Sequence, residues 1–343
     1  MTASVQTTRS PLLDRHGAVE GEGLDAGVAA HYGDPMREQR LLAEGLAVVD
    51  LSHRGVVTVS GPDRLTWLHS MTTQQLAGLA PRSSAESLVL SPKGHVEHAL
   101  HVVDDGATTW LSLEPGTAPA LVAWLESMRF MLRVEVADVS DAWAVLGEPV
   151  GSESADGEPL AWVDPWPRLV GDTAAYGPVE GHAGEGRAWR ELLVPRGGIE
   201  AAVGDRPLAG TWAAEALRVA AWRPRFGHET DHRTIPHEVD WLRTAVHLHK
   251  GCYRGQETIA RVHNLGRPPR RVVFLHLDGS GHVLPAVGSP VTLEGREVGR
   301  LTSVARHHED GPVALAVVKR SVAEDVDFVV DGISAAQTVV VRG

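Results

Sequence analysis

The sequence predicts an α+β protein with two structurally different parts. Between residues 34 and 268, short apolar strands alternate with segments whose apolar residues recur at helical spacing. From residue 269 to the end, the pattern is one of short β-type runs separated by Gly and Asp turns, which is typical of a small β-barrel. We therefore expect a body at 34–268 and a C-terminal β-barrel domain at 269–343.

Local signals predict the elements of the body in order. Helices are indicated by proline in a first turn or by apolar residues spaced three and four apart, and strands by apolar runs that end in Gly, Asp or Pro turns. The expected helices are 35–46, 62–71, 117–130 and 211–222, and the expected strands are 48–51, 56–59, 86–90, 95–103, 108–113, 133–139 and 188–195. The Gly- and Ser-rich segment at 148–157 predicts a boundary between two lobes.

Composition limits the class of protein. The chain has 343 residues, of which 43% are hydrophobic and 22% charged, as in an ordinary globular protein of about two domains. Residues 1–33 are rich in small and polar side chains and lack an apolar signal segment, so we expect a disordered lead-in there. One cysteine excludes an intrachain disulfide. No run is long enough to span a membrane, and we expect a cytoplasmic protein.

The charge is acidic overall but locally positive. A net charge of −12 argues against binding to duplex DNA, which requires a basic surface. The segment 250–271, however, holds six Lys and Arg residues and one acid. Such a positive patch suits a discrete anionic ligand, such as a phosphate, a polyglutamate tail or a short RNA segment. The alternative is a solvated surface with scattered arginines.

The stretch K-G-C-Y-R-G-Q-E at 250–257 contains the chain's cysteine, Cys252. Its two glycines indicate positions where the backbone takes a positive φ or packs closely against a neighbour. Lys250, Arg254 and the helix expected after Gly255 would lower the pKa of the Cys252 thiol, because each stabilises the thiolate. The alternative is an inert, buried cysteine.

This stretch resembles the signature of the YgfZ-type folate-binding proteins, K-G-C-Y-x-G-Q-E, in the superfamily of the glycine-cleavage aminomethyltransferase. Residues 50–65, with D-L-S-H-R-G and then V-S-G-P-D-R-L, are similar to a second segment typical of this superfamily. The resemblance implies an aminomethyltransferase-like folate-binding body with tetrahydrofolate as cofactor. It also implies a role in iron–sulfur cluster assembly or repair, with iron–sulfur proteins or assembly factors as partners, and in tRNA modification, without a turnover reaction.

The resemblance further implies site residues. Glu191 lies in a strand similar to the E-x-x-(V/L)-P strand of aminomethyltransferases and would grip the pterin, since a carboxylate accepts hydrogen bonds from both N3–H and the 2-amino group. Cys252 would be a reactive thiol assisted by Lys250 and Arg254. The other folate-site residues implied are Glu97, Arg218, Tyr253, Gln256 and Glu257, and the glutamate tail of the folate would face the positive patch at 250–271.

A tetrahydrofolate-dependent aminomethyl or one-carbon transferase is the alternative function. It requires a general acid or base near the folate. Glu97 is the candidate, because it lies on the strand where aminomethyltransferases carry a catalytic aspartate. The longer glutamate side chain moves the carboxylate by about one C–C bond, which counts against this alternative.

Two residue sets have the character of metal ligands. His95, Glu97 and His101 would share one face of a strand, and H-x-H-x-x-C occupies 247–252. Each has a simpler interpretation, as an exposed polar face or as a chance pair in a chain with 18 histidines. We therefore expect no resident metal.

Overall fold

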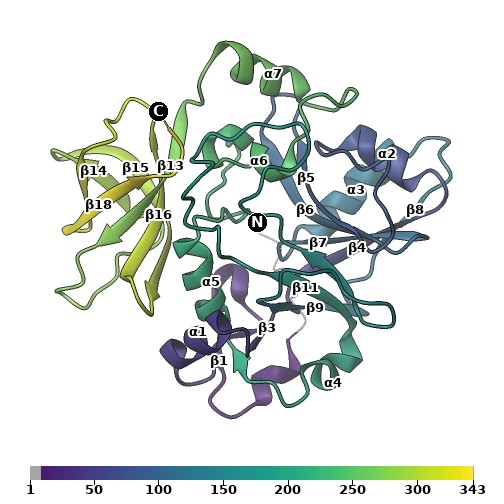
Figure 1. Ribbon diagram of the computed structural model, residues 1–343, viewed down its shortest axis with the longest axis horizontal. Helices are drawn as coiled ribbons and strands as arrows, with labels where there is room; N and C mark the ends of the chain where they lie inside the picture. Colours follow the sequence, from purple (N-terminus) through teal and green to yellow (C-terminus); the bar gives the residue numbers. More distant parts are fainter. Residues whose placement is uncertain (1–8, 343) are drawn as a thin grey trace. The chain divides into compact units, whose positions relative to one another are not determined.

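The computed structural model describes residues 9–342 (Figure 1). Its residues divide into two compact units. Unit 1 is formed by the residues up to 88, by 98–164 and by 188–214, and unit 2 by 89–97, 165–187 and 215–343. The chain thus leaves unit 1 after Leu88, Asp164 and Ala214 and not within the expected boundary of 148–157, because an irregular segment does not reveal which distant segments pack together.

Two five-stranded sheets form the framework of unit 1 in the part of the chain that the structure describes. Their orders are β10-β11-β9-β3-β12 and β5-β6-β7-β4-β8. The strands are β3 (Val48–Asp50), β4 (Gly55–Ser60), β5 (Ser84–Leu90), β6 (Val96–Asp104), β7 (Thr108–Leu113), β8 (Glu135–Asp138), β9 (Trp143–Glu148), β10 (Leu160–Val163), β11 (Arg190–Pro195) and β12 (Leu208–Ala209). β12 runs parallel to β3, whereas β11 runs antiparallel to both β10 and β9. The turn between β5 and β6 belongs to unit 2.

Short helices connect these strands. They are α1 (Pro35–Ala43), α2 (Arg64–Met71), α3 (Ala118–Met128), η3 (Arg196–Gly198) and α4 (Ile199–Val203), and α5 (Thr211–Ala220) leads into unit 2. The side chain of Asp34 caps α1 by accepting a hydrogen bond from the Arg37 N–H. α1 ends before the expected residue 46, because Gly45 takes a φ of +80°.

The expected disorder of the lead-in is wrong for the part that the structure describes. This part forms η1 (Pro11–Asp14), β1 (Val19–Glu20), η2 (Gly23–Asp25) and β2 (Ala29–His31). Leu12 is fully buried in one core cluster with Val48 and Leu146. The small and polar residues of this segment suggested disorder. A few apolar side chains are nevertheless enough to order it, because they pack into the core against a β-sheet. Residues 1–8 of this call lie outside the described residues.

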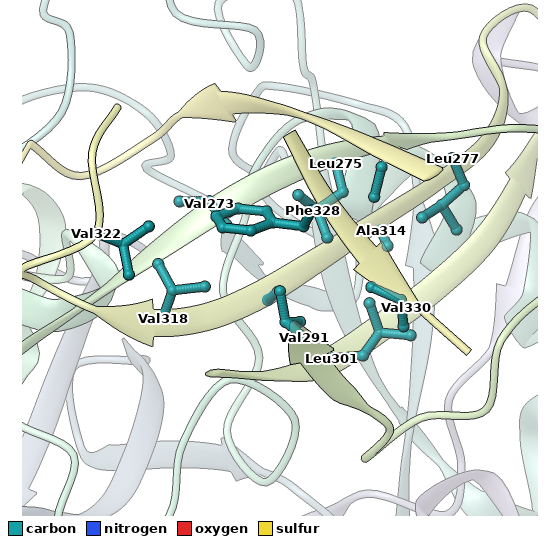
Figure 2. Close-up of a cluster of buried hydrophobic side chains, with 12 residues drawn as sticks. Val273, Leu275, Leu277, Val291, Leu301, Ala314, Val318, Val322, Phe328 and Val330 are labelled. Atoms are coloured by element: carbon teal, nitrogen blue, oxygen red, sulfur yellow. The ribbon is translucent and has the colours of Figure 1, made fainter. Parts of the chain in front are cut away.

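The last part of unit 2 is a closed β-barrel in the order β13-β16-β15-β14-β17-β18, green to yellow in Figure 1. Its strands are β13 (Arg270–Leu277), β14 (Pro290–Leu293), β15 (Arg296–His307), β16 (Gly311–Lys319), β17 (Asp327–Val330) and β18 (Ile333–Val339). Figure 2 shows Phe328 among Val273, Leu275 and Val318 in the core of this barrel. The predicted C-terminal β-barrel is therefore confirmed.

The remaining helices of unit 2 precede the barrel. They are η4 (Pro236–Val239), α6 (Leu242–Ala245) and α7 (Gln256–Leu265). Over the described residues, none of the helices combines the length and the apolar character needed to cross a membrane.

Candidate functional site

The loop at 250–255 leads into α7 and packs against the turn between β5 and β6. Gly255 is the N-cap of α7 and has a φ of +83°. A Cβ at Gly255 would lie 2.6 Å from the carbonyl oxygen of Ser91, and one at Gly94 would lie 2.7 Å from Cβ of Thr258. Positive φ and close packing both require glycine at position 255, as predicted. Gly251 differs, because a Cβ there would meet nothing within 4 Å.

Replacing Gly255 by alanine is expected to destabilise unit 2 by about 1–3 kcal/mol, because the strained φ is combined with a backbone clash. Gly251→Ala is the matched control and should change the unfolding free energy by less than about 0.5 kcal/mol. Thermal unfolding and amide hydrogen exchange over 250–265 would measure both. Equal exchange rates in the two variants would show that Gly255 does not fix the loop.

An ion pair also joins the motif loop to β6, between residues that are 157 positions apart in sequence. Nη1 of Arg254 donates to Oε2 of Glu97 over 3.0 Å. Glu97 also lines a pocket of about 440 Å³, a volume within the range of small-molecule sites. The other lining residues are Ser91, His95, Val96, Phe226, Gly227, Thr230, Asp231 and His232. Glu97 is therefore paired with the motif at the edge of a ligand-sized pocket.

Cys252 is exposed, whereas its neighbours Lys250 and Tyr253 are each only 8% exposed. Nζ of Lys250 lies 5.3 Å from the centroid of the Tyr253 ring. Burial lowers the pKa of Lys250 to about 7 and raises the pKa of Tyr253. Lys250 is thus only partly charged at neutral pH, and the guanidinium of Arg254 forms an ion pair with Glu97. The motif loop therefore carries one partly charged amine and one ion-paired guanidinium, rather than the two isolated positive charges that the sequence predicted.

The amine of Lys250 is expected to react with an acylating reagent already at pH 7–8, because about half of it is neutral near its pKa of about 7. Labelling across pH 5–10 followed by mass spectrometry would give a midpoint near 7 for the peptide that contains Lys250. Lys250→Met identifies the signal by its loss. A midpoint close to the ordinary lysine value of about 10.4 would contradict the expectation.

Gln256 and Glu257 open α7. The carboxylate of Glu257 is exposed in the first turn, where the partial positive charge of the helix N-terminus stabilises it. Ile259 is the buried residue of this helix. Glu257 and Ile259 therefore stabilise the first turns of α7, directly after the motif loop.

The positive patch expected at 250–271 does not form a continuous charged surface. Nη1 of Arg270 donates to Asp231 over 2.7 Å, and Arg271 on β13 is fully buried. Arg261 and Arg267 are exposed on and after α7. The patch was predicted from the number of cations along the chain. In the fold, an acid from a preceding segment pairs with one of these cations.

Glu191 on β11 is the centre of a buried polar cluster in unit 1. Nη1 of Arg54 donates to its Oε1 over 2.6 Å, and Nδ1 of His101 lies 2.8 Å from its Oε2. Ser112 also donates to Oε2, over 3.1 Å, and Nη2 of Arg54 donates to Glu114 over 3.3 Å. Burial alone would raise the pKa of Glu191, but Arg54 and His101 outweigh burial and hold it well below its usual range. Glu191 is therefore an ionised acceptor although it is only 2% exposed.

Several known proteins are similar to this chain in sequence over much of its length. A family model described as the GCVT N-terminal domain matches residues 11–149. A chloroplastic putative transferase from Arabidopsis thaliana is 26% identical over 337 residues, covering 91% of this chain and 74% of that protein. An aminomethyltransferase from Moorella thermoacetica is 27% identical over 324 residues, covering 86% of this chain and 85% of that protein.

The crystal structure of glycine cleavage system aminomethyltransferase T from Bartonella henselae matches with a TM-score of 0.74 at 20% identity, covering 97% of this chain and 95% of that one. The chain has a GcvT-like fold, and its residues 11–149 match the GCVT N-terminal domain. The expected aminomethyltransferase-like fold is thereby confirmed.

Resemblance to the aminomethyltransferase superfamily pointed to Glu191 but not to the side chains that hold it. Arg54 lies within the D-L-S-H-R-G segment and had no role assigned, and His101 was considered only as a metal ligand. Ser112 and Trp162 carried no signal at all. The position of Arg54 inside a superfamily segment is the one clue that sequence reasoning had available.

Arg218, which the superfamily resemblance implied as a folate ligand, is instead committed to a buried network. It donates to Glu215, Glu229 and Ser303 and to the carbonyl oxygen of Arg223, with distances of 2.6–3.0 Å. It is 6% exposed, and its Nε, Nη1 and Nη2 all donate within the protein. The donors of Arg218 are therefore occupied within the protein, and the folate role implied for it stays a prediction.

Neither of the two residue sets with metal-ligand character becomes a metal centre. Across residues 9–342, no group of three or more His, Cys, Asp and Glu side chains is arranged to hold a metal ion. Nδ1 of His249 lies 2.5 Å from Asp172, and His101 contacts Glu191.

Proposed function

We propose that this chain binds tetrahydrofolate and supports the assembly or repair of iron–sulfur enzymes, including enzymes of tRNA modification, as a YgfZ-type member of the superfamily. The observation that carries the proposal is the anchored display of Cys252. Gly255 and Arg254 fix the motif loop to the hairpin that bears Glu97, while the thiol between Gly251 and Tyr253 remains exposed. A fixed, exposed thiol suits transient contact with a cluster or a partner protein.

Two further observations support the folate part of the proposal. Glu191 is ionised and buried, which is the state that accepts hydrogen bonds from a pterin ring. The pocket of about 440 Å³ beside Glu97 has the volume of a small-molecule site. The proposal includes a cytoplasmic location, where reducing conditions keep a single cysteine free.

Calorimetry with tetrahydrofolate tests the ligand. We expect the native chain to bind, Glu191→Gln to weaken binding by at least about 100-fold, and Cys252→Ala to bind as the native chain does. Glu148→Gln is the matched control, because Glu148 forms a comparable buried ion pair with Arg190 on the neighbouring strand. Absence of binding at millimolar tetrahydrofolate would refute the folate assignment.

Complementation tests the role of the thiol. In cells that lack this chain, the native gene should restore the activity of iron–sulfur enzymes, and Cys252→Ala should not. Restoration of this activity by the Cys252→Ala variant would show that the thiol is not required. The protein level of each variant is compared by immunoblot, so that loss of function is separated from loss of protein.

Aminomethyl transfer to tetrahydrofolate is the second candidate function, favoured by the similarity to aminomethyltransferases over most of the chain. Glu97 would act as its acid or base, but Arg254 holds that carboxylate in an ion pair. Transfer from an aminomethyl donor that depends on tetrahydrofolate, and is lost in Glu97→Gln but retained in Cys252→Ala, would favour this candidate instead.

A further inference from the structure

The ring of His101 occupies a defined position on Trp162. Trp162 on β10 is the direct cross-strand partner of Glu191 on β11, so that both side chains lie on one face of their sheet. His101 comes from β6 in the other sheet of unit 1. Its ring centroid lies 3.6 Å from that of Trp162, and the two ring planes differ by 2°. His101 is therefore stacked flat on the indole.

The same imidazole is hydrogen-bonded to the buried carboxylate. Its Nδ1 lies 2.8 Å from Oε2 of Glu191 and 3.4 Å from Nη1 of Arg54. An ionised carboxylate only accepts, so the shorter contact identifies Nδ1–H as a donor to Glu191. His101 thus combines face-to-face stacking with an in-plane N–H bond to a carboxylate. A flat heterocyclic ligand with N–H groups would make these same two interactions.

We propose that His101 is an internal placeholder for the ring of the ligand. In this inference, which rests on the proposed function, a 2-amino-4-oxo heterocycle displaces His101 from Trp162 and Glu191 when it binds. Trp162 becomes the platform on which the ring of the ligand stacks.

The cluster itself indicates that His101 moves and Arg54 stays. The side chain of His101 is 15% exposed, whereas those of Arg54 and Glu191 are 10% and 2% exposed. Arg54 is held at both ends, by Glu191 and by Glu114. Ser112 still donates to Oε2 of Glu191 once the imidazole has left. The carboxylate therefore keeps its charge and its orientation during the exchange.

An internal competitor lowers the apparent affinity of the ligand, because the binding-competent state is only a fraction of the ensemble. His101→Ala should therefore bind a tetrahydropterin that lacks the benzoylglutamate tail on the order of tenfold more tightly than the native chain. His101→Asn retains an N–H donor without a ring and should show a smaller gain. His98→Ala is the matched control, since His98 is a buried histidine on the opposite face of β6 and should leave the affinity unchanged.

The indole N–H signal of Trp162 gives a readout that does not depend on folate. In ¹⁵N-labelled protein this signal is identified, among those of ten tryptophans, by its absence in Trp162→Phe. Millimolar imidazole should shift it in His101→Ala and not in the native chain. If imidazole shifts the signal but neither protein binds a pterin or tetrahydrofolate, the His101 position can accept a ring, but the folate assignment and the displacement by a 2-amino-4-oxo heterocycle both fail.

The opposite pattern overturns the inference alone. If tetrahydrofolate binds and Glu191→Gln abolishes binding, while His101→Ala and His101→Asn gain no affinity for the tetrahydropterin, the proposed function stands and His101 is not a placeholder. An unchanged Trp162 signal in a folded His101→Ala variant with imidazole overturns it as well.

Discussion

Replacing Arg218 by alanine is expected to lower the free energy of unfolding by about 3–5 kcal/mol. Arg218 is 6% exposed, and its guanidinium group bridges Glu215 on α5, Glu229, and Ser303 on β15. Glu229 is 1% exposed and would lose the charged hydrogen bond from Arg218 while it remains buried among hydroxyl and backbone donors. The loss of a cationic partner by a buried carboxylate is far more costly than the loss of a surface contact, and a urea midpoint at constant m-value would measure the cost.

Arg129→Ala is the matched control for this prediction. Arg129 also pairs with a glutamate three residues earlier, Glu126, but over 3.4 Å and with side chains 43% and 38% exposed. Its removal should cost less than about 1 kcal/mol. Similar costs for the two variants would show that burial does not set the strength of the Arg218 network.

The destabilisation by Arg218→Ala should also depend on pH. Burial alone would raise the pKa of Glu215, but Arg218 and Arg225 lower it to about 2. A carboxylate with a depressed pKa in the folded state contributes stability above its ordinary pKa of about 4.3 and loses that contribution as the pH falls towards 2. The difference between the native chain and the variant should therefore be full at pH 6–7 and shrink below pH 4. A difference that grows on acidification would contradict this sign.

Phe328→Ala is expected to destabilise the C-terminal barrel by about 3–5 kcal/mol. Phe328 on β17 is 1% exposed and lies in the middle of the cluster in Figure 2. Truncation removes the apolar contacts of the ring with side chains from several strands and leaves a cavity that a closed barrel cannot collapse around. Urea denaturation followed by far-ultraviolet circular dichroism would measure the loss.

Val329 supplies the control on the same strand. It follows Phe328 directly, points to the opposite face and is 45% exposed. Val329→Ala should change the unfolding free energy by no more than about 0.5 kcal/mol. A loss comparable to that of Phe328→Ala would indicate that the strand itself, rather than the core ring, is what the substitutions disturb.

Local patterns predicted the barrel and the helix that follows the motif. The short alternating runs after residue 270 contain the core side chains Val273, Leu275 and Phe328, and strand alternation places such residues on one face wherever the strand lies. Gly255 likewise required only local reasoning, because a positive φ at a helix start is a property of the backbone at that residue.

The candidate site was only partly predictable. The resemblance pointed to Glu191 and to the motif at 250–257, but the partners of Glu191 lie 79–137 residues away in sequence. Arg218 and Arg270 show the same limit from the other side, since each looked available in the sequence and is paired with acids in the fold. Ion pairing between distant segments leaves no periodic signal in the chain.

The sequence by itself determined the expected helices and strands of the body, the barrel and the helix start at Gly255, because these depend on backbone conformation, side-chain alternation and short-range spacing. Only the tertiary structure decided that Lys250 is buried, that Arg254 meets Glu97, and that His101 lies on Trp162 beside Glu191. Burial and charge pairing depend on which distant segments come together, and the charge state of a side chain follows from that environment rather than from its neighbours in sequence.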